Sequence, residues 1–95
     1  MMDLSDYTVI YKDADKQLLV NKTEFNYSII MKEGEAYTEV LVSAEEIDNS
    51  MTFPEADKLS WKKQFALLFG NNKGFNRFIQ YCDENGISTQ TLIWD

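Results

Sequence analysis

The chain has 95 residues, of which 44% are hydrophobic, and it carries a net charge of −7 at pH 7. This length and apolar content predict one folded domain rather than a disordered chain, and no run approaches the roughly 20 apolar residues that a membrane span needs. Without a histidine, the chain has no Ser–His or Cys–His nucleophile pair and no imidazole metal ligand.

Cysteine content and the N-terminal sequence indicate the compartment. Cys82 is the single cysteine, which excludes an internal disulfide and suits a reducing cytosol. The first ten residues, MMDLSDYTVI, contain neither a basic segment nor an apolar stretch of the kind that signal peptides have. We therefore expect a cytoplasmic protein.

The first third of the chain predicts a β-hairpin. Residues 7–12 (YTVIYK) are β-rich, with Tyr7, Val9 and Tyr11 on one face and Thr8 and Ile10 on the other. Residues 17–20 (QLLV) form a second short β-rich run. Asp13-Ala14-Asp15 between them has the composition of a turn. Residues 21–24 then lead into the next strand.

The stretch from Phe25 to Ser43 predicts a second, longer hairpin. Strand side chains alternate between two faces, and one face of the first strand is almost wholly apolar, which predicts a sheet covered on one side. The predicted core side of that strand consists of Phe25, Tyr27, Ile29 and Met31.

The loop of this hairpin sets its register. With Glu33-Gly34 as a two-residue loop, Lys32 faces Glu35, and each step outward adds a pair. A one-residue slip would oppose apolar and polar positions, so this register is favoured. A three-residue loop is the alternative.

After Ser43 the spacing of apolar residues changes from the two-residue period of strands to the period of helices. Ser43-Ala44-Glu45-Glu46 has the spacing of a capping box and predicts a short helical turn over 44–49. A helix over 54–69 follows, with Pro54 in its first turn and Gly70 as a left-handed cap. Its apolar residues lie on more than one side, among them Leu67, so we expect burial on more than one side.

The last third predicts a second helix and a final strand. The helix spans 74–85 and ends at Gly86, and residues 88–94 (STQTLIW) are β-branched and aromatic. The apolar stripe of the helix has the spacing i, i+3, i+4, i+7 and consists of Phe75, Phe78, Ile79 and Cys82.

These elements predict a single α+β domain over residues 1–95. We expect an antiparallel sheet of about five strands, made of an N-terminal four-stranded meander and a C-terminal strand, with two helices packed on one face. Cys82 lies on an apolar stripe without a base beside it, which favours an inert core thiol. We expect no enzymatic activity, no cofactor and no metal site.

The charge distribution gives the strongest functional indication. Residues 33–57 contain eight acids and no Lys or Arg. We predict that this acidic belt binds a basic protein surface, as an inhibitor or nucleic-acid mimic of the phage or mobile-element type, and that the domain does not bind nucleic acid directly. A solvated face that keeps the domain soluble is the ordinary alternative. The predicted partner-binding residues are Glu33, Glu35, Glu39, Glu45, Glu46 and Asp48.

Two further functions belong to other classes. The helices at 54–85 carry all basic residues of the second half, which would suit a nucleic-acid-binding accessory protein. Alternatively, the domain is a structural subunit that self-associates through a sheet edge or exposed aromatics, so we expect a monomer or a homodimer. The nucleic-acid hypothesis uses Lys62, Lys63, Lys73, Arg77 and Gln80.

Overall fold

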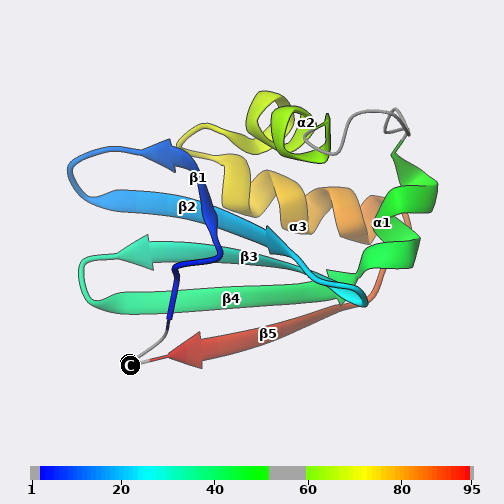
Figure 1. Cartoon of the computed structure of the whole chain (residues 1–95), viewed down its shortest axis with the longest axis horizontal. Coiled ribbons are helices and arrows are strands. Elements are labelled where there is room, and N and C mark those ends of the chain that lie inside the picture. The colour runs from blue at the N-terminus through cyan, green and yellow to red at the C-terminus, as the bar shows by residue number, and fades with distance from the viewer. Residues whose placement is uncertain (1–2, 52–59, 95) are drawn as a thin grey trace.

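A computed structural model describes residues 3–51 and 60–94 of the chain. Its five strands form one antiparallel sheet in the order β1-β2-β3-β4-β5 (Figure 1), which confirms the α+β class and the predicted meander. In this described part there are three helices rather than two, because the predicted helical turn after Ser43 forms a capped helix. The elements are β1 (Thr8–Lys12), β2 (Lys16–Lys22), β3 (Asn26–Glu33), β4 (Ala36–Ser43), α1 (Ala44–Ser50), α2 (Ser60–Phe69), α3 (Gly74–Glu84) and β5 (Thr89–Trp94).

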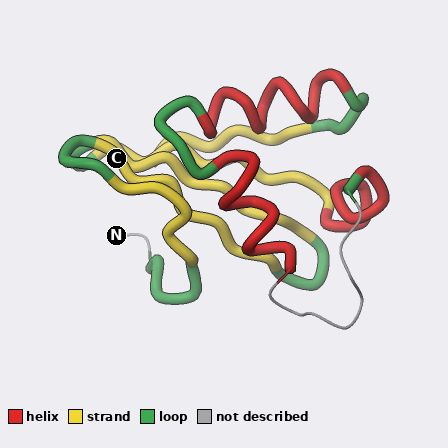
Figure 2. The backbone as a smooth tube through the Cα atoms, turned by 90° about the horizontal axis from the view of Figure 1, so that it is seen from above, coloured by secondary structure: helices red, strands yellow, loops and turns green. Residues whose placement is uncertain are grey.

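The two faces of the sheet have different coverings. Figure 2 shows α3 along one face and α1 at the end where β4 finishes. The main core lies between this face and the helices, and it includes Tyr27 and Ile29 from β3 together with Phe65 and Phe78 from the helices. Residues 3–7 cross the opposite face (Figure 1), where the Tyr7 hydroxyl reaches the side chain of Ser28 on β3.

The hairpin of β3 and β4 differs from the predicted register by two residues. Glu33 pairs with Ala36, and Tyr27 pairs with Val42. The two-residue loop is therefore Gly34-Glu35 rather than Glu33-Gly34. Gly34 has a φ of 58°, which suits the first central position of a type II′ turn, whereas no other described residue besides Gly86 has a positive φ. A shift of two residues leaves every strand side chain on its predicted face. The buried face of the hairpin is therefore predicted correctly although the register is wrong.

Two residues that were expected in the interior lie on the surface. Phe25 is 73% exposed because β3 begins at Asn26 and Phe25 belongs to the preceding turn. Leu67 is 83% exposed because α2 buries one side only, through Phe65 and Phe69. The predicted start of this helix at Pro54 lies outside the described residues.

The two predicted glycine caps have different outcomes. Gly86 has a φ of 67° and is the left-handed residue that follows α3, as expected. Gly70 does not have a positive φ, so that prediction is wrong. Its role is close packing: a Cβ at Gly70 would clash with the carbonyl oxygen of Ala66 in α2 and would lie 2.7 Å from the carbonyl oxygen of Ile10 on β1. The end of α2 therefore approaches the backbone of β1 as only a glycine allows.

Replacing this glycine should loosen the contact between α2 and the sheet. We expect Gly70→Ala to lower the free energy of unfolding by about 2 kcal/mol or more, since a backbone must move to admit the methyl group. Urea unfolding followed by circular dichroism measures the change. Leu67→Ala, one turn earlier and exposed, is the control and should shift stability by no more than about 0.5 kcal/mol. Equal stabilities of the two variants would contradict the packing role.

Candidate partner-binding surface

Acidic side chains gather where β4 ends and α1 begins. Three segments meet there. The amide of Ala44 donates to the carbonyl of Phe25 at 2.9 Å, which joins the β2–β3 turn to α1. The Tyr81 hydroxyl donates to Ser50 Oγ at 2.7 Å, which joins the end of α3 to α1. We call this surface the acidic end, and its residues are Glu24, Glu45, Glu46, Asp48, Asp83 and Glu84.

Charge at the acidic end is almost entirely of one sign. In residues 22–25, 43–51 and 81–86 the six acids are accompanied by one basic residue, Lys22, which gives a net charge of −5. One of these carboxylates acts on a neighbouring group. Burial raises the pKa of Cys82 to about 11, and the charge of Glu46 is the second cause.

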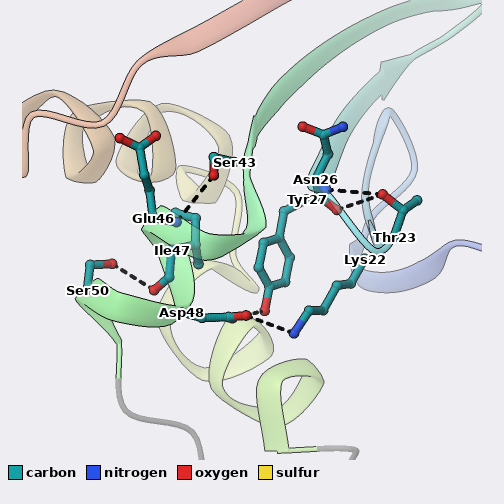
Figure 3. A network of polar contacts seen from close by, with 9 residues as sticks. All are labelled: Lys22, Thr23, Asn26, Tyr27, Ser43, Glu46, Ile47, Asp48 and Ser50. Carbon is teal, nitrogen blue, oxygen red and sulfur yellow. Dashed lines mark hydrogen bonds and ion pairs between the residues drawn. The ribbon is translucent and has the colours of Figure 1, made fainter.

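Helix α1 positions its acids through a cap and two buried residues. Ser43 has an extended backbone, and its Oγ accepts from the amide of Glu46 (Figure 3), so the capping-box serine acts as predicted. Ala44 and Ile47 are buried, while Glu45 and Glu46 are exposed in the first turn. Carboxylates at this position interact favourably with the positive end of the helix dipole.

Asp48 has a structural role on the same helix. Its Oδ1 accepts a 2.6 Å hydrogen bond from the Tyr27 hydroxyl, and its Oδ2 lies 3.1 Å from Lys22 Nζ (Figure 3). Burial raises the pKa of the Tyr27 phenol, and the hydrogen bond and charge of Asp48 raise it further. Asp48 therefore ties α1 to the sheet, and its charge is paired with Lys22, whose side chain is 32% exposed.

An exposed aromatic ring accompanies the acids. Phe25 lies in the β2–β3 turn, and its carbonyl bonds to α1. The turn is held from within, because the amide of Asn26 donates to Thr23 Oγ1 at 3.1 Å and the amide of Thr23 donates to the Asn26 carbonyl at 2.8 Å. The ring is thus presented on a fixed turn rather than on a loose loop.

The β3–β4 turn is remote from the acidic end and nearly neutral. Glu33 and Glu35 are exposed there, as predicted for partner contacts. Because β4 has eight residues, this turn lies about 24 Å from α1 at a rise of ~3.4 Å per residue. The meander places the β1–β2 turn beside it, since Lys16 pairs with Glu33. The two turns together contain Lys12, Asp13, Asp15, Lys16, Lys32, Glu33 and Glu35.

Glu39 is buried and does not contribute to an outer surface. It is 6% exposed, on the sheet face that Tyr7 covers. Its Oε2 accepts from the hydroxyls of Ser28 and Tyr7, the latter at 3.2 Å, and its Oε1 accepts from Trp94 Nε1 at 3.2 Å. Burial, followed by the charge of Glu39, raises the pKa of Tyr7. This carboxylate connects the N-terminal segment, β3, β4 and β5.

The structure thus divides the six predicted residues among three places. Glu45, Glu46 and Asp48 share the acidic end, two others lie at the far turn, and Glu39 is internal. The sequence analysis missed three acids that the fold adds, namely Glu24, Asp83 and Glu84. No local pattern identifies them, because contacts of α1 with the β2–β3 turn and with α3 bring them together.

The basic residues of the helices do not form one surface. Lys62 and Lys63 lie near the start of α2, with Lys62 Nζ above the ring of Trp61. Lys73 and Arg77 lie at the start of α3, which follows the other end of α2. Gln80 is paired with Glu84 at 2.9 Å. This arrangement does not bring together the predicted nucleic-acid contacts.

Three comparisons with known proteins were made, and no protein-family model, curated protein or solved structure matches the chain. Across residues 3–51 and 60–94, no helix has the length and hydropathy of a membrane span. The same residues contain no group of three Cys, Asp or Glu side chains arranged to hold a metal ion. The functional argument therefore depends on the geometry of the domain.

Burial of Tyr27, together with its bond to Asp48, raises the pKa of the phenol and makes stability depend on alkaline pH. A free phenol loses its proton near pH 10, so above this pH the unfolded chain releases a proton that folded Tyr27 keeps. The stabilisation is complete below pH 10 and is lost as the pH rises above it, by at most about 1.4 kcal/mol per pH unit. Cys82 adds a similar loss between pH 9 and about 11.

We expect Tyr27→Phe to reduce this alkaline loss. At neutral pH the variant should be less stable by about 1.5–3 kcal/mol, since it lacks one hydrogen bond to a carboxylate. Above pH 10 its stability should fall less steeply than that of the wild type, because the phenol is absent. Urea unfolding at neutral pH and at several values above pH 10 measures both effects. If the free energy of unfolding falls equally steeply with pH in both proteins, Tyr27 is not the cause of the alkaline loss.

The buried carboxylate on the other face should be equally important for stability. We expect Glu39→Ala to lower the free energy of unfolding by about 2–4 kcal/mol, since hydroxyl and indole donors lose a charged acceptor. The control is Glu35→Ala in the exposed turn, which should stay within about 0.5 kcal/mol of the wild type. Thermal and urea unfolding of both variants measure the difference. If they are equally stable, the network does not hold the sheet face together.

Proposed function

We propose that the domain is a non-enzymatic protein-binding module whose acidic end docks on a basic protein surface. The observation that carries this proposal is the meeting of three segments that place six acids and one lysine at one end of the domain. Exposed carboxylates of one sign attract a basic partner over a distance and favour a complementary surface. The concrete form is an inhibitor or nucleic-acid mimic that occupies a nucleic-acid-binding surface.

Recognition is better supported than catalysis at this end of the domain. The single cysteine, Cys82, is fully buried, and its raised pKa keeps it protonated at neutral pH. Glu45 and Glu46 are exposed to solvent. Asp48 is occupied by Tyr27 and Lys22. These groups supply charge and shape rather than an activated acid or base.

Phe25 makes the surface more than a patch of charge. Aromatic side chains are favoured anchors at interfaces when they enter a pocket on the partner. This ring is 73% exposed and stands on a turn with internal hydrogen bonds. A fixed anchor loses little conformational entropy on binding. We therefore place Phe25 in the contact, with the carboxylates of α1 around it.

Carboxylates on rigid elements can take the place of phosphates. Glu45 and Glu46 project from a capped helix, and Glu24 projects from the adjoining turn, so the charges are held by the backbone on both sides. A partner that binds nucleic acid through Lys and Arg would meet charges of the same sign as phosphates. The affinity of such a complex falls as salt rises, because the attraction is screened.

Charge reversal at the acidic end tests the proposal. We expect the triple variant Glu24→Lys, Glu45→Lys, Glu46→Lys to lose capture of basic proteins from lysate at low salt, with an affinity lower by orders of magnitude. The triple reversal Asp15→Lys, Glu33→Lys, Glu35→Lys at the far turns is the charge-matched control and should retain capture. Mass spectrometry identifies the bound proteins, and duplex DNA should displace them if mimicry is correct.

A substitution at Phe25 distinguishes specific docking from general attraction between charges. Phe25→Ser keeps every charge and removes one exposed ring, so non-specific attraction would be unchanged. We expect it to weaken binding to the captured protein at least tenfold in a titration, which corresponds to about 1.4 kcal/mol. If neither Phe25→Ser nor the acidic-end reversal alters capture, the acidic end serves solubility and the proposal is wrong.

A further inference from the structure

Helix α3 ends at the one Asn-Gly pair in the sequence, Asn85-Gly86. In such a pair the backbone nitrogen of the glycine can attack the side-chain amide carbon of the asparagine, because glycine has no Cβ to hinder the approach. Both residues are exposed to solvent, at the acidic end. The pair therefore carries a chemistry besides its structural role at the end of the helix.

The folded backbone holds the pair in an unreactive conformation. The ψ angle of Asn85 is 7°, so the Gly86 nitrogen lies beside the backbone nitrogen of Asn85 and away from the side-chain carbon that it would attack. The side-chain amide is held as well, because Asn85 Nδ2 donates to the carbonyl of Tyr81 at 2.8 Å. Rotation of the backbone and loss of this bond must therefore precede the reaction.

The last turn of α3 is suited to brief opening. Helix ends fray, and exposed backbone hydrogen bonds open more easily than buried ones. The amide of Gly86 donates to the carbonyl of Asp83 at 3.2 Å, while the next amide, that of buried Ile87, donates to the carbonyl of Cys82 at 2.8 Å. Asn85 and Gly86 can thus rotate while the chain on both sides stays in place.

We infer that Asn85 is a site of spontaneous deamidation whose rate is set by the opening of this turn. The Gly86 nitrogen loses its proton to hydroxide and forms a bond to Asn85 Cγ, and the Cγ–Nδ2 bond breaks as the side-chain nitrogen leaves as ammonia. Water then adds to one of the two carbonyl carbons of the cyclic imide, whose C–N bond breaks to give aspartate or isoaspartate. Water is the only co-reactant, and no oxidant or reductant is required.

The product changes both the charge and the attachments of the acidic end. A carboxylate replaces the neutral amide, so the net charge of the segments at this end changes from −5 to −6. A carboxylate cannot donate to the Tyr81 carbonyl, and a negative charge is unfavourable near the C-terminal end of a helix. Tyr81 also ties α3 to α1 through Ser50. The reaction therefore weakens the end of the helix that supports α1.

Incubation of the full chain at mildly alkaline pH tests the inference. Tandem mass spectrometry of the intact chain locates each residue at which an amide has become a carboxylate. Asn71 and Asn72 are the internal control, because they lie in the loop between α2 and α3 and neither precedes a glycine. We expect Asn85 to convert about tenfold faster than either, or more, because only its following residue lacks a Cβ. Equal or slower conversion at Asn85 would overturn the inference.

The control of the rate by α3 is tested in urea. Unfolding the chain should speed conversion at Asn85 by about tenfold or more, since the last turn is then always open. If the native and unfolded chains convert equally fast, the helix end does not set the rate and that part of the inference is wrong. Asn85→Gln should not form the product, because its longer side chain would have to close a larger ring.

The effect on α3 is measured on the product itself. Anion exchange separates the deamidated chain, which carries one more negative charge, from the unmodified chain. Urea unfolding of the two should give a lower midpoint for the deamidated chain, because it lacks the bond from Asn85 to the Tyr81 carbonyl. Equal midpoints would contradict the role of this bond.

Discussion

The position of α1, and with it the acidic end, depends on Tyr27. This residue is fully buried on β3, and it contacts two helices. Its ring stacks on Phe65 with centroids 5.1 Å apart and meets the edge of Trp61 at 5.6 Å, which fixes α2. Its hydroxyl donates to Asp48, which fixes α1. One side chain thus combines the packing of the core with the placement of a surface helix.

A continuous set of contacts returns from this core to the other side of α1. Phe65 packs on Phe69, and Phe69 meets Tyr81 at a centroid distance of 6.1 Å. The Tyr81 hydroxyl then donates to Ser50 in the last turn of α1. The short helix is therefore held at Asp48 and at Ser50. A seven-residue helix is marginal on its own, and these two attachments offset the repulsion among the acids that it carries and adjoins.

The sequence predicts those features that depend on local pattern. The alternation in β3 and β4 identifies the buried face, and Ser43 marks the start of α1. The register requires the turn conformation as well, and Gly34 occupies the first central position of the turn where the second was expected. Phe25 has the spacing of a core residue but lies one residue before the strand. The burial of Glu39 depends on Tyr7 crossing the sheet, a long-range contact that leaves no mark in the sequence around either residue.

The acidic belt shows that charges in one run of the sequence can lie far apart in the fold. In the sequence, eight acids from Glu33 onward form one block, but the strand β4 within it separates the ends by about 24 Å. The neighbouring hairpin brings lysines to one end, and α3 brings Asp83 and Glu84 to the other. As a result, the domain is acidic at one end of the strands and nearly neutral at the other. The proposed docking on a basic partner is therefore confined to one end of the domain, because the charges at the far turns are nearly balanced.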